Sequence, residues 1–440
     1  MQTLTDMTDQ IRQTMPTAIR GSIVRTVGST ASVADFPAPV GALVEIERQG
    51  SEPALAEVIG FRDQLTLVYL LHSVNGLRHG NRVRLVRTSR WIRVGDELLG
   101  RVINAQAEPI DGRPRPVLHE RVPLDRAPLS AIERPRIDTP LSTGIRAIDG
   151  LLSCGKGQRI GIFAGSGVGK SVTLGMMSRY TTADVNVVAL IGERGREVNE
   201  FIQRDLGPAL DKTVVVVATS DEPALARVQA AFTATAVAEY FRDLGRDVLL
   251  VMDSLTRLAL AQREIGLAAG EPPTTRGFPP SVFSQLPRLL ERAGCSPRGS
   301  ITGFYSVLVE GDDPNEPISD TVRGLLDGHI WLARKLAARG HYPAIDVLES
   351  VSRLMTEVAD DEHRAAAQRV RELLSVYREH EDLISIGAYR RGANPSVDLA
   401  IEQLGPINDF LRQRVDERSS VAEAREQLMG LCQQAQRQTS

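Results

Sequence analysis

The sequence predicts an α/β protein built from three parts. Residues 1–90 favour a small β-barrel domain, because short alternating apolar runs follow one another between turn residues. Residues 91–360 favour a central α/β domain, because strand-like apolar runs alternate with stretches long enough for helices. Residues 361–440 lack strand signals and predict a C-terminal helical domain.

Composition excludes several classes of protein. With 42% hydrophobic and 24% charged residues, the 440-residue chain is not disordered along its whole length. Its net charge of −3 gives no bulk affinity for polyanions, and no apolar run approaches the roughly 18 residues that span a bilayer. The N-terminus, Met1–Thr17, is polar and lacks the apolar core of a signal peptide. Because Cys154, Cys295 and Cys432 are widely spaced and match no metal-ligand pattern, we expect a cytoplasmic protein.

The N-terminal part carries its strand signals in short alternating runs, which suit a barrel or a sandwich. A segment rich in Gly, Pro and Arg follows, in which Leu98–Asn104 could form a hairpin and Pro114–Pro140 is expected to be an extended connector. The alternating runs are residues 22–27, 42–46, 65–70 and 82–86.

The central part alternates strands with helices, which indicates a mostly parallel sheet covered on both faces. Its expected strands are residues 159–163, 185–191, 213–218, 247–252, 300–309 and 328–332. The C-terminal part predicts helices over residues 361–377, 397–414 and 421–436, with breaks near Gly387 and Gly392.

A glycine-rich loop between the strand at 159–163 and a helix-forming stretch is the strongest chemical signal. This order is typical of a phosphate-binding loop, in which backbone N–H groups and a helix N-terminus face the phosphates. Lys170, one of only four lysines among 52 basic residues, would reach the β- and γ-phosphates, and the Ser171 hydroxyl would ligate Mg²⁺. Ala164 stands where the general pattern has glycine, and it requires only a negative φ. The candidate ATP-binding residues here are Gly165, Ser166, Gly167, Val168, Gly169, Lys170, Ser171 and Val172.

Two further strands end in an acidic residue. Carboxyl ends of parallel strands lie at the edge where such sheets bind ligands. Glu193 could polarise the water that attacks a γ-phosphate, or could belong to a solvated charged turn. Asp253 follows five apolar residues, which is the Walker B pattern for holding Mg²⁺.

Several longer motifs resemble the type III protein-export ATPases, within the superfamily of rotary-ATPase α/β subunits. The resemblance covers about residues 20–413. It rests on Phe163–Ser171, on Gly192–Val198, and on the stretches Asp253-Ser254-Leu255-Thr256-Arg257, Ala261–Leu267, Glu271-Pro272-Pro273, Gly277–Phe283, Gly340-His341-Tyr342-Pro343 and Pro343–Arg353.

The resemblance implies a RecA-like core within a homo-hexameric ring that binds ATP between subunits. It implies that Glu193 is the catalytic carboxylate with Arg194 nearby, and that Arg353 is a finger reaching the neighbour's γ-phosphate, a role that suits the guanidinium fork. Tyr342 matches the aromatic residue that stacks on adenine. Phe410 is expected on the other side of the base, with a core role equally open.

The implied function is an ATP-hydrolysing motor for protein export, which releases substrates from chaperones. We favour the flagellar system, with the injectisome as the alternative. A rotary synthase subunit is disfavoured, because its acidic torque loop is replaced by the basic stretch Tyr389–Pro395. An RNA-driven translocase is disfavoured too, because residues 1–90 contain only Phe36, Phe61 and Tyr69 as aromatics, too scattered for a nucleic-acid platform. Expected partners are chaperone–substrate complexes, a regulatory stator protein, a coiled-coil stalk and an export gate, with peripheral attachment to the cytoplasmic membrane and no nucleic acid.

Overall fold

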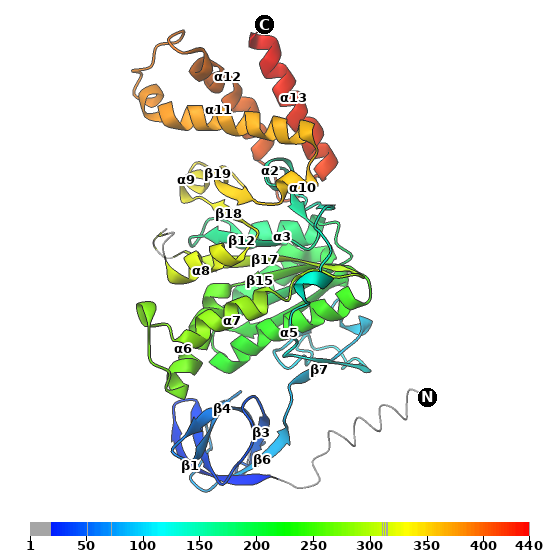
Figure 1. Ribbon diagram of the computed structural model, residues 1–440, viewed down its shortest axis with the longest axis vertical. Helices are drawn as coiled ribbons and strands as arrows, with labels where there is room; N and C mark the ends of the chain where they lie inside the picture. Colours follow the sequence, from blue (N-terminus) through cyan, green and yellow to red (C-terminus); the bar gives the residue numbers. More distant parts are fainter. Residues whose placement is uncertain are drawn as a thin grey trace.

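The computed structural model describes residues 19–439 except residues 51, 72, 310, 312, 314 and 315. Three parts are stacked along the long axis of the molecule, with a β-barrel at one end, a large sheet in the middle and helices at the other end (Figure 1). The predicted α/β class, with an N-terminal barrel and a C-terminal helical domain, is therefore confirmed. The predicted polar segment Met1–Thr17 lies outside the described residues.

The N-terminal barrel is closed, because β1 pairs with both β2 and β6. Small and branched apolar side chains alternate toward its interior, as Val44 and Ile46 on β3 show. The sequence analysis did not single out β2 and β4, which complete the barrel. The strands are β1 (Arg20–Val27), β2 (Thr30–Ala34), β3 (Leu43–Ile46), β4 (Ala54–Arg62), β5 (Leu65–Leu70) and β6 (Arg82–Arg87), in the order β1-β2-β5-β4-β3-β6.

The segment between the barrel and the main sheet departs from its prediction at two places. β8 (Val102–Ile103) does not belong to a hairpin over Leu98–Asn104, because it pairs in parallel with β14 as the edge of the central sheet. A tight turn comes later, where the Asn104 N–H donates to the Glu108 carbonyl at 2.8 Å. The extended connector also contributes β9 (Glu120–Pro123), which pairs with β7 (Trp91–Val94), and β10 (Pro140–Leu141), which pairs with β11 (Cys154–Gly155).

The central sheet has nine strands within the described part of the chain, and most of its neighbours are parallel. β19 is antiparallel to β18 and was not predicted as a strand. The order is β19-β18-β12-β17-β15-β13-β14-β8, with β16 paired to β17. The bounds are β12 (Arg159–Ala164), β13 (Val185–Glu193), β14 (Thr213–Thr219), β15 (Asp247–Asp253), β16 (Gly294–Cys295), β17 (Ser300–Leu308), β18 (Gly328–Leu332) and β19 (Ile345–Ser352).

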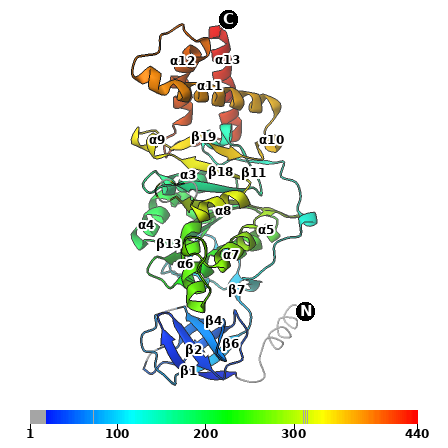
Figure 2. The same ribbon diagram turned by 60° about the vertical axis from the view of Figure 1, so that its left-hand side comes forward.

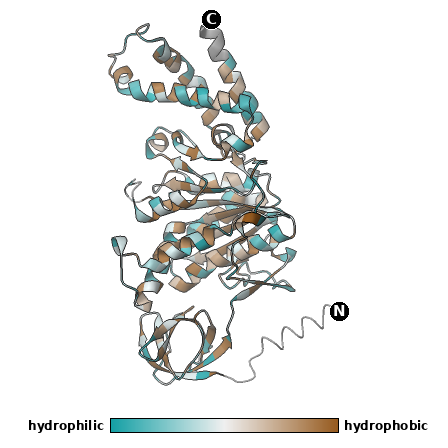
Figure 3. Cartoon of the chain, viewed as in Figure 1, coloured by the Kyte–Doolittle hydropathy of each residue, from teal (hydrophilic) through white to brown (hydrophobic). Residues whose placement is uncertain are grey.

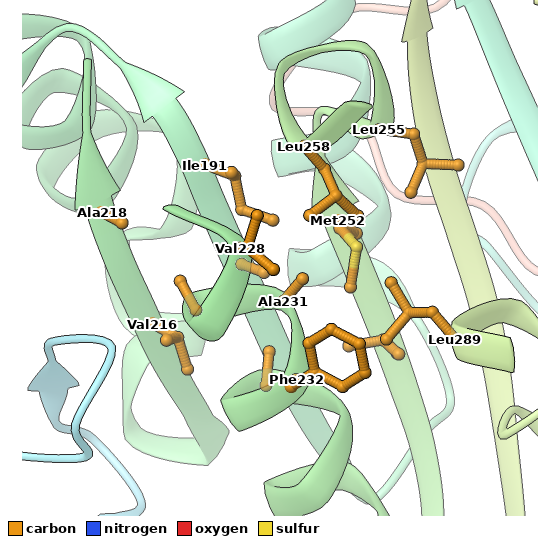
Figure 4. Close-up of a cluster of buried hydrophobic side chains, with 14 of the residues drawn as sticks. Ile191, Val216, Ala218, Val228, Ala231, Phe232, Met252, Leu255, Leu258 and Leu289 are labelled. Atoms are coloured by element: carbon orange, nitrogen blue, oxygen red, sulfur yellow. The ribbon is translucent and has the colours of Figure 1, made fainter. Parts of the chain in front are cut away.

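Helices cover both faces of this sheet, which explains why its inner strands β13, β14 and β15 are mainly apolar and almost wholly buried. On β13, Val187, Ala189 and Ile191 pack toward α5, α6 and α7, whereas Val188 and Leu190 pack toward α3 and the C-terminal helices. Figure 4 shows Phe232 and its neighbours from α5 filling the first of these layers. The helices are α2 (Arg146–Leu151), α3 (Lys170–Tyr180), α4 (Gly195–Glu200), α5 (Ala224–Asp243), α6 (Leu255–Ala269), α7 (Pro280–Leu290), α8 (Pro317–Leu325), α9 (Arg334–Ala338) and α10 (Met355–Val358).

The C-terminal part consists of α11 (Asp361–Ser385), α12 (Pro395–Leu411) and α13 (Val421–Thr439). Asp360 caps α11 by accepting from the His363 N–H, and Asn394 caps α12 by accepting from the Ser396 N–H. The three helices lie together at the end of the molecule away from the barrel (Figure 2). Polar and apolar residues alternate along α11, as expected for a helix packed on one face (Figure 3). Among the described helices, none combines the length and apolarity needed to cross a membrane.

Candidate functional site

The glycine-rich loop joins the end of β12 to the start of α3, as the sequence predicts. Ala164 is the last residue of β12 and remains within the ladder, paired with both Leu308 and Leu332. Gly167 and Gly169 have φ of +78° and +92°, in the left-handed region that favours glycine. The loop therefore leads directly into the N-terminus of α3, where its N–H groups suit an anion.

Lys170 lies between the two acidic strand ends. Its Nζ is 2.5 Å from Asp253 Oδ1 and 3.8 Å from Glu193 Oε1. The Ser306 hydroxyl also donates to Asp253 Oδ1, at 2.6 Å. These contacts bring the start of α3 together with β13, β15 and β17 near their carboxyl ends, where open α/β sheets bind ligands. Ser306 could not be predicted from the sequence, because a buried serine in an apolar strand carries no chemical signal.

Glu193 is buried, with 8% of its surface exposed, so it does not belong to a solvated turn. Arg257, near the start of α6, holds it, with Nε 3.2 Å from Oε1 and a terminal nitrogen donating to Oε2 at 3.4 Å. Gly192, with φ of +69°, makes room for this contact, because a Cβ there would lie 2.9 Å from Arg257 Cδ. Burial, and next the Asp253 carboxylate, raise the pKa of Glu193, against the charges of Lys170 and Arg257. A raised pKa makes the carboxylate a better proton acceptor.

Arg257 is a site residue to which the sequence analysis assigned no role. Its position in the sequence nevertheless carries a signal. It follows Asp253 by four residues, one turn into a helix that begins where the β15 strand ends. That spacing returns its side chain to the strand-end edge of the sheet.

The donor atoms around Lys170 suit Mg²⁺. Ser171 lies exposed in the first turn of α3, next to Lys170, and its hydroxyl and the Asp253 carboxylate are both hard oxygen ligands. The described residues contain no group of three or more His, Cys, Asp or Glu that could hold a metal alone. This fits Mg²⁺, which is usually held by one or two protein oxygens together with substrate phosphates.

A cavity of about 690 Å³ opens beside the glycine-rich loop. Tyr342 is 46% exposed in it, and its ring would lie 3.6 Å from a Cβ on Gly169. The backbone N–H of Gln413 donates to the Tyr342 carbonyl at 3.0 Å, which ties the C-terminal part to this wall. The cavity is lined by Gly169, Val172, Thr173, Met176, Gly340, Tyr342, Pro343 and residues 412–417. Its size and its aromatic wall suit a nucleoside.

Phe410 is placed apart from this cavity. Only 5% of its surface is exposed, and its ring tip would lie 2.7 Å from a Cβ on Gly150 in α2. Its carbonyl accepts from Arg146 Nε at 3.0 Å. The ring therefore packs into the core between α2 and α12, which corresponds to the core role left open for it.

Two predicted arginines lie away from the Lys170 cluster. The Arg194 side chain is 76% exposed and pairs with Glu197 at 3.0 Å. Arg353 is exposed and follows β19, which runs antiparallel to β18. Ser352 pairs with Gly328, whereas the glycine-rich loop leaves the sheet beside Leu332. Those positions are four residues apart, about 13 Å. Arg353 therefore lies near the amino-terminal end of β18, whereas the glycine-rich loop of the same chain lies near the carboxyl-terminal end of that strand.

Comparison with known proteins identifies the family. Residues 144–352 match the ATP synthase alpha/beta family, nucleotide-binding domain, and residues 359–430 match the T3SS EscN ATPase C-terminal domain. The chain is 50% identical over 405 residues to the flagellum-specific ATP synthase of Bacillus subtilis, covering 92% of this chain and 91% of the relative. It is 49% identical over 402 residues to the type 3 secretion system ATPase of Xanthomonas euvesicatoria, with 91% of each covered.

A solved structure is similar over nearly the whole chain. The assembled ATPase EscN from the enteropathogenic E. coli type III secretion system matches with a TM-score of 0.89 and 47% identity, covering 93% of this chain and 99% of that one. The same ATPase in complex with its central stalk EscO matches with a TM-score of 0.86. The matched nucleotide-binding domain includes Lys170, and the chain belongs to the family of type III protein-export ATPases, which comprises flagellum-specific ATP synthases and type 3 secretion system ATPases.

Proposed function

We propose that the Lys170 cluster binds ATP with Mg²⁺ and hydrolyses its γ-phosphate bond. The observation that carries this proposal is the meeting of Lys170, Asp253 and Glu193 at one edge of the sheet, beside the Tyr342 cavity. The loop N–H groups and Lys170 hold the phosphates, while Tyr342 stacks on the adenine. Ser171 and Asp253 hold Mg²⁺, which supplies positive charge for the phosphate oxygens.

Glu193 orients and deprotonates the attacking water. Its raised pKa suits that task, and Arg257 fixes the direction of its carboxylate. When ATP is bound, the phosphates compete for Lys170, which frees Asp253 from its contact with the ammonium. Arg194, exposed at the start of α4, lies close enough in sequence to approach the same phosphates after a movement of its loop.

The position of Arg353 supports a ring in which each site is completed by a neighbour. Because Arg353 lies near the opposite end of the strands from the glycine-rich loop of its own chain, its guanidinium is available to the loop of another copy. We propose a homo-hexamer with ATP between subunits. EscN was solved in an assembled form and with a central stalk, and a coiled-coil stalk is therefore the first partner that we propose for this chain.

We propose that the ring drives flagellar protein export, with the injectisome as the second candidate. Its further partners would be chaperone–substrate complexes, a stator protein and an export gate at the cytoplasmic face of the membrane. Relatives of the two kinds match at 50% and 49% identity. Deletion of the gene distinguishes the systems: loss of filaments and motility supports flagellar export, whereas intact motility with lost secretion of other proteins supports the injectisome.

Mixing two inactive variants tests the shared site. Arg353→Ala and Lys170→Ala should each abolish hydrolysis, because an arginine finger alone is worth on the order of 10³–10⁵ in rate. In mixed rings, some interfaces pair an intact loop with an intact finger, so phosphate release should exceed the sum of the separate variants. Mixed assemblies that form, as shown by co-purification of two tags, and yet recover no activity would contradict a finger acting between subunits.

Glu193→Gln tests the role of the carboxylate. The amide keeps the shape but accepts no proton, so turnover should fall by about 10²–10⁴ while ATP binding persists. In the wild type, activity should decline as the pH falls through the raised pKa of Glu193, because the protonated acid cannot accept the proton of water. Equal loss of binding and turnover in the variant would make Glu193 a structural residue instead.

A further inference from the structure

A cluster of arginines surrounds Trp91, the first residue of β7, and Figure 1 shows β7 between the barrel and α5. The guanidinium carbons of Arg87 and Arg121 lie 4.6 Å and 4.3 Å from the centroid of its ring. On the β7–β9 ribbon, Arg93 stands directly opposite Arg121, so the two share one face with Trp91. Ile92 and Val94 point the other way, into the core. The ribbon thus presents like charges side by side around one aromatic ring.

This face opens onto a cavity of about 380 Å³, which we call the Trp91 cavity. It is lined by, among others, Arg87, Trp91, Arg93, Arg115, Val117 and His119. Glu108 is the acidic residue that lines it, and it is engaged by Arg115 at 3.5 Å and by the Asn104 side chain at 3.3 Å. Burial, and secondly the charge of Arg121, lower the pKa of Arg87. The cavity therefore has an excess of positive charge.

The same cavity has donors without acceptors and an exposed apolar wall. Arg87 Nε and Gln106 Nε2 are buried with no hydrogen-bond partner among the described residues, and both residues line the cavity. Buried polar atoms normally find partners, so these two indicate a place where acceptors are missing. Val117 is 68% exposed beside them. A ligand that matches this lining brings oxygen acceptors, negative charge and an apolar side chain together.

We propose that the Trp91 cavity binds an acidic peptide segment of a partner protein. Carboxylates meet the guanidinium groups that line the cavity as charge-assisted pairs, and an aliphatic side chain covers Val117 and the Trp91 ring. An inorganic anion would leave the apolar wall uncovered. A nucleic acid needs several exposed aromatic rings along a basic track, and the cavity has one. This inference is independent of the proposed chemistry at Lys170.

Fluorescence of Trp91 gives a direct test, because the chain contains only one other tryptophan. In the Trp331→Phe protein, Trp91 is the sole emitter. The acetylated, amidated peptide Glu-Glu-Leu-Glu-Glu should shift its emission saturably, and Gln-Gln-Leu-Gln-Gln should not. Calorimetric titration of the same peptides into the wild type gives the answer independently of the Trp331 substitution.

Paired variants locate the binding. The double variant Arg93→Gln, Arg115→Gln should lower the affinity for the acidic peptide at least tenfold and leave ATP hydrolysis unchanged. The control removes two exposed charges elsewhere, with Arg25→Gln and Arg288→Gln, and should bind normally. Failure of the acidic peptide to bind at millimolar concentration, or equal binding of the glutamine peptide, would overturn the proposal. So would equal responses to inorganic phosphate or to a single-stranded oligonucleotide, or peptide binding that is lost as the protein self-associates.

Discussion

Tyr342 and Phe410 offer a matched test of how the base is held, because both were expected beside adenine and the structure separates them. Tyr342 is 46% exposed in the cavity, whereas Phe410 is 5% exposed against α2. Truncating the exposed ring to alanine should hardly alter the free energy of unfolding. Truncating the buried ring should lower it by about 3–5 kcal/mol, because a cavity is left in the core.

The effects on nucleotide affinity should be reversed, with a large change in the Tyr342 variant and little change in the Phe410 variant. Aromatic stacking on a base is worth about 1–3 kcal/mol, so Tyr342→Ala should raise the KM for ATP by roughly 5- to 150-fold, with kcat nearly unchanged. Phe410→Ala, assayed below its lowered melting temperature, should keep a KM within about twofold of the wild type. The assays are ATPase kinetics and thermal unfolding of the same preparations.

One pattern of results would refute this reasoning. If Phe410→Ala raises the KM while its melting temperature stays unchanged, the ring contacts the base and not the core. Phe410→Leu refines the comparison, because it keeps much of the apolar volume and loses the aromatic face. Leucine should restore most of the stability, and its KM should match that of the wild type.

Two further predictions concern buried carboxylates. Gly192→Ala places a side chain in the left-handed region of backbone conformation, which costs about 1–2 kcal/mol, and puts its Cβ 2.9 Å from Arg257 Cδ. The Arg257–Glu193 contact should be disturbed, so kcat should fall with little change in ATP affinity. An unchanged kcat would show that this contact is dispensable. Burial, opposed by Arg90, raises the pKa of Glu57 to about 7 from 4.5, so the folded barrel binds this proton more tightly than the unfolded chain does. The resulting stability is present below pH 4.5 and is lost as the pH rises to about 7, on the order of 3 kcal/mol. Glu57→Gln should flatten the melting temperature between these pH values, and an unflattened profile would contradict the assignment.

Local signals were enough to predict the strand, the glycine-rich loop and the helix around Lys170, and the position of Asp253 at a strand end. A strand, a glycine-rich turn and a helix are consecutive in the chain, and an acidic residue at a strand end is visible in a single run of residues. The three-part organisation could be predicted for the same reason, since hydrophobic periodicity is a property of neighbouring residues. The long C-terminal helices followed from periodicity too, although α11 extends to Ser385, beyond its predicted end.

Strands of weak hydrophobicity could not be predicted in this way. β2, Thr30–Ala34, contains four small or polar residues, and it is a strand because β1 and β5 pair with it on either side. β8 was expected in a hairpin but forms an edge strand of the central sheet. This pairing could not be predicted from local sequence, because its partner β14 lies more than 100 residues away. In each case, long-range pairing prevailed over local preference.

The surroundings of each candidate side chain depend on packing between distant segments, so only the tertiary structure decided them. From the sequence, Glu193 fitted a solvated turn as well as a catalytic role. In the structure it contacts Arg257, which is 64 residues further along the chain. Phe410 is a core residue because α2 packs against it across 260 residues of sequence. The arginines around Trp91 come from separate stretches that only the β7–β9 pairing brings together. Residue type and spacing therefore predict a site that lies within one segment of the chain. The environment of a single charged or aromatic side chain depends on residues that are distant in the sequence, and only the tertiary structure determines it.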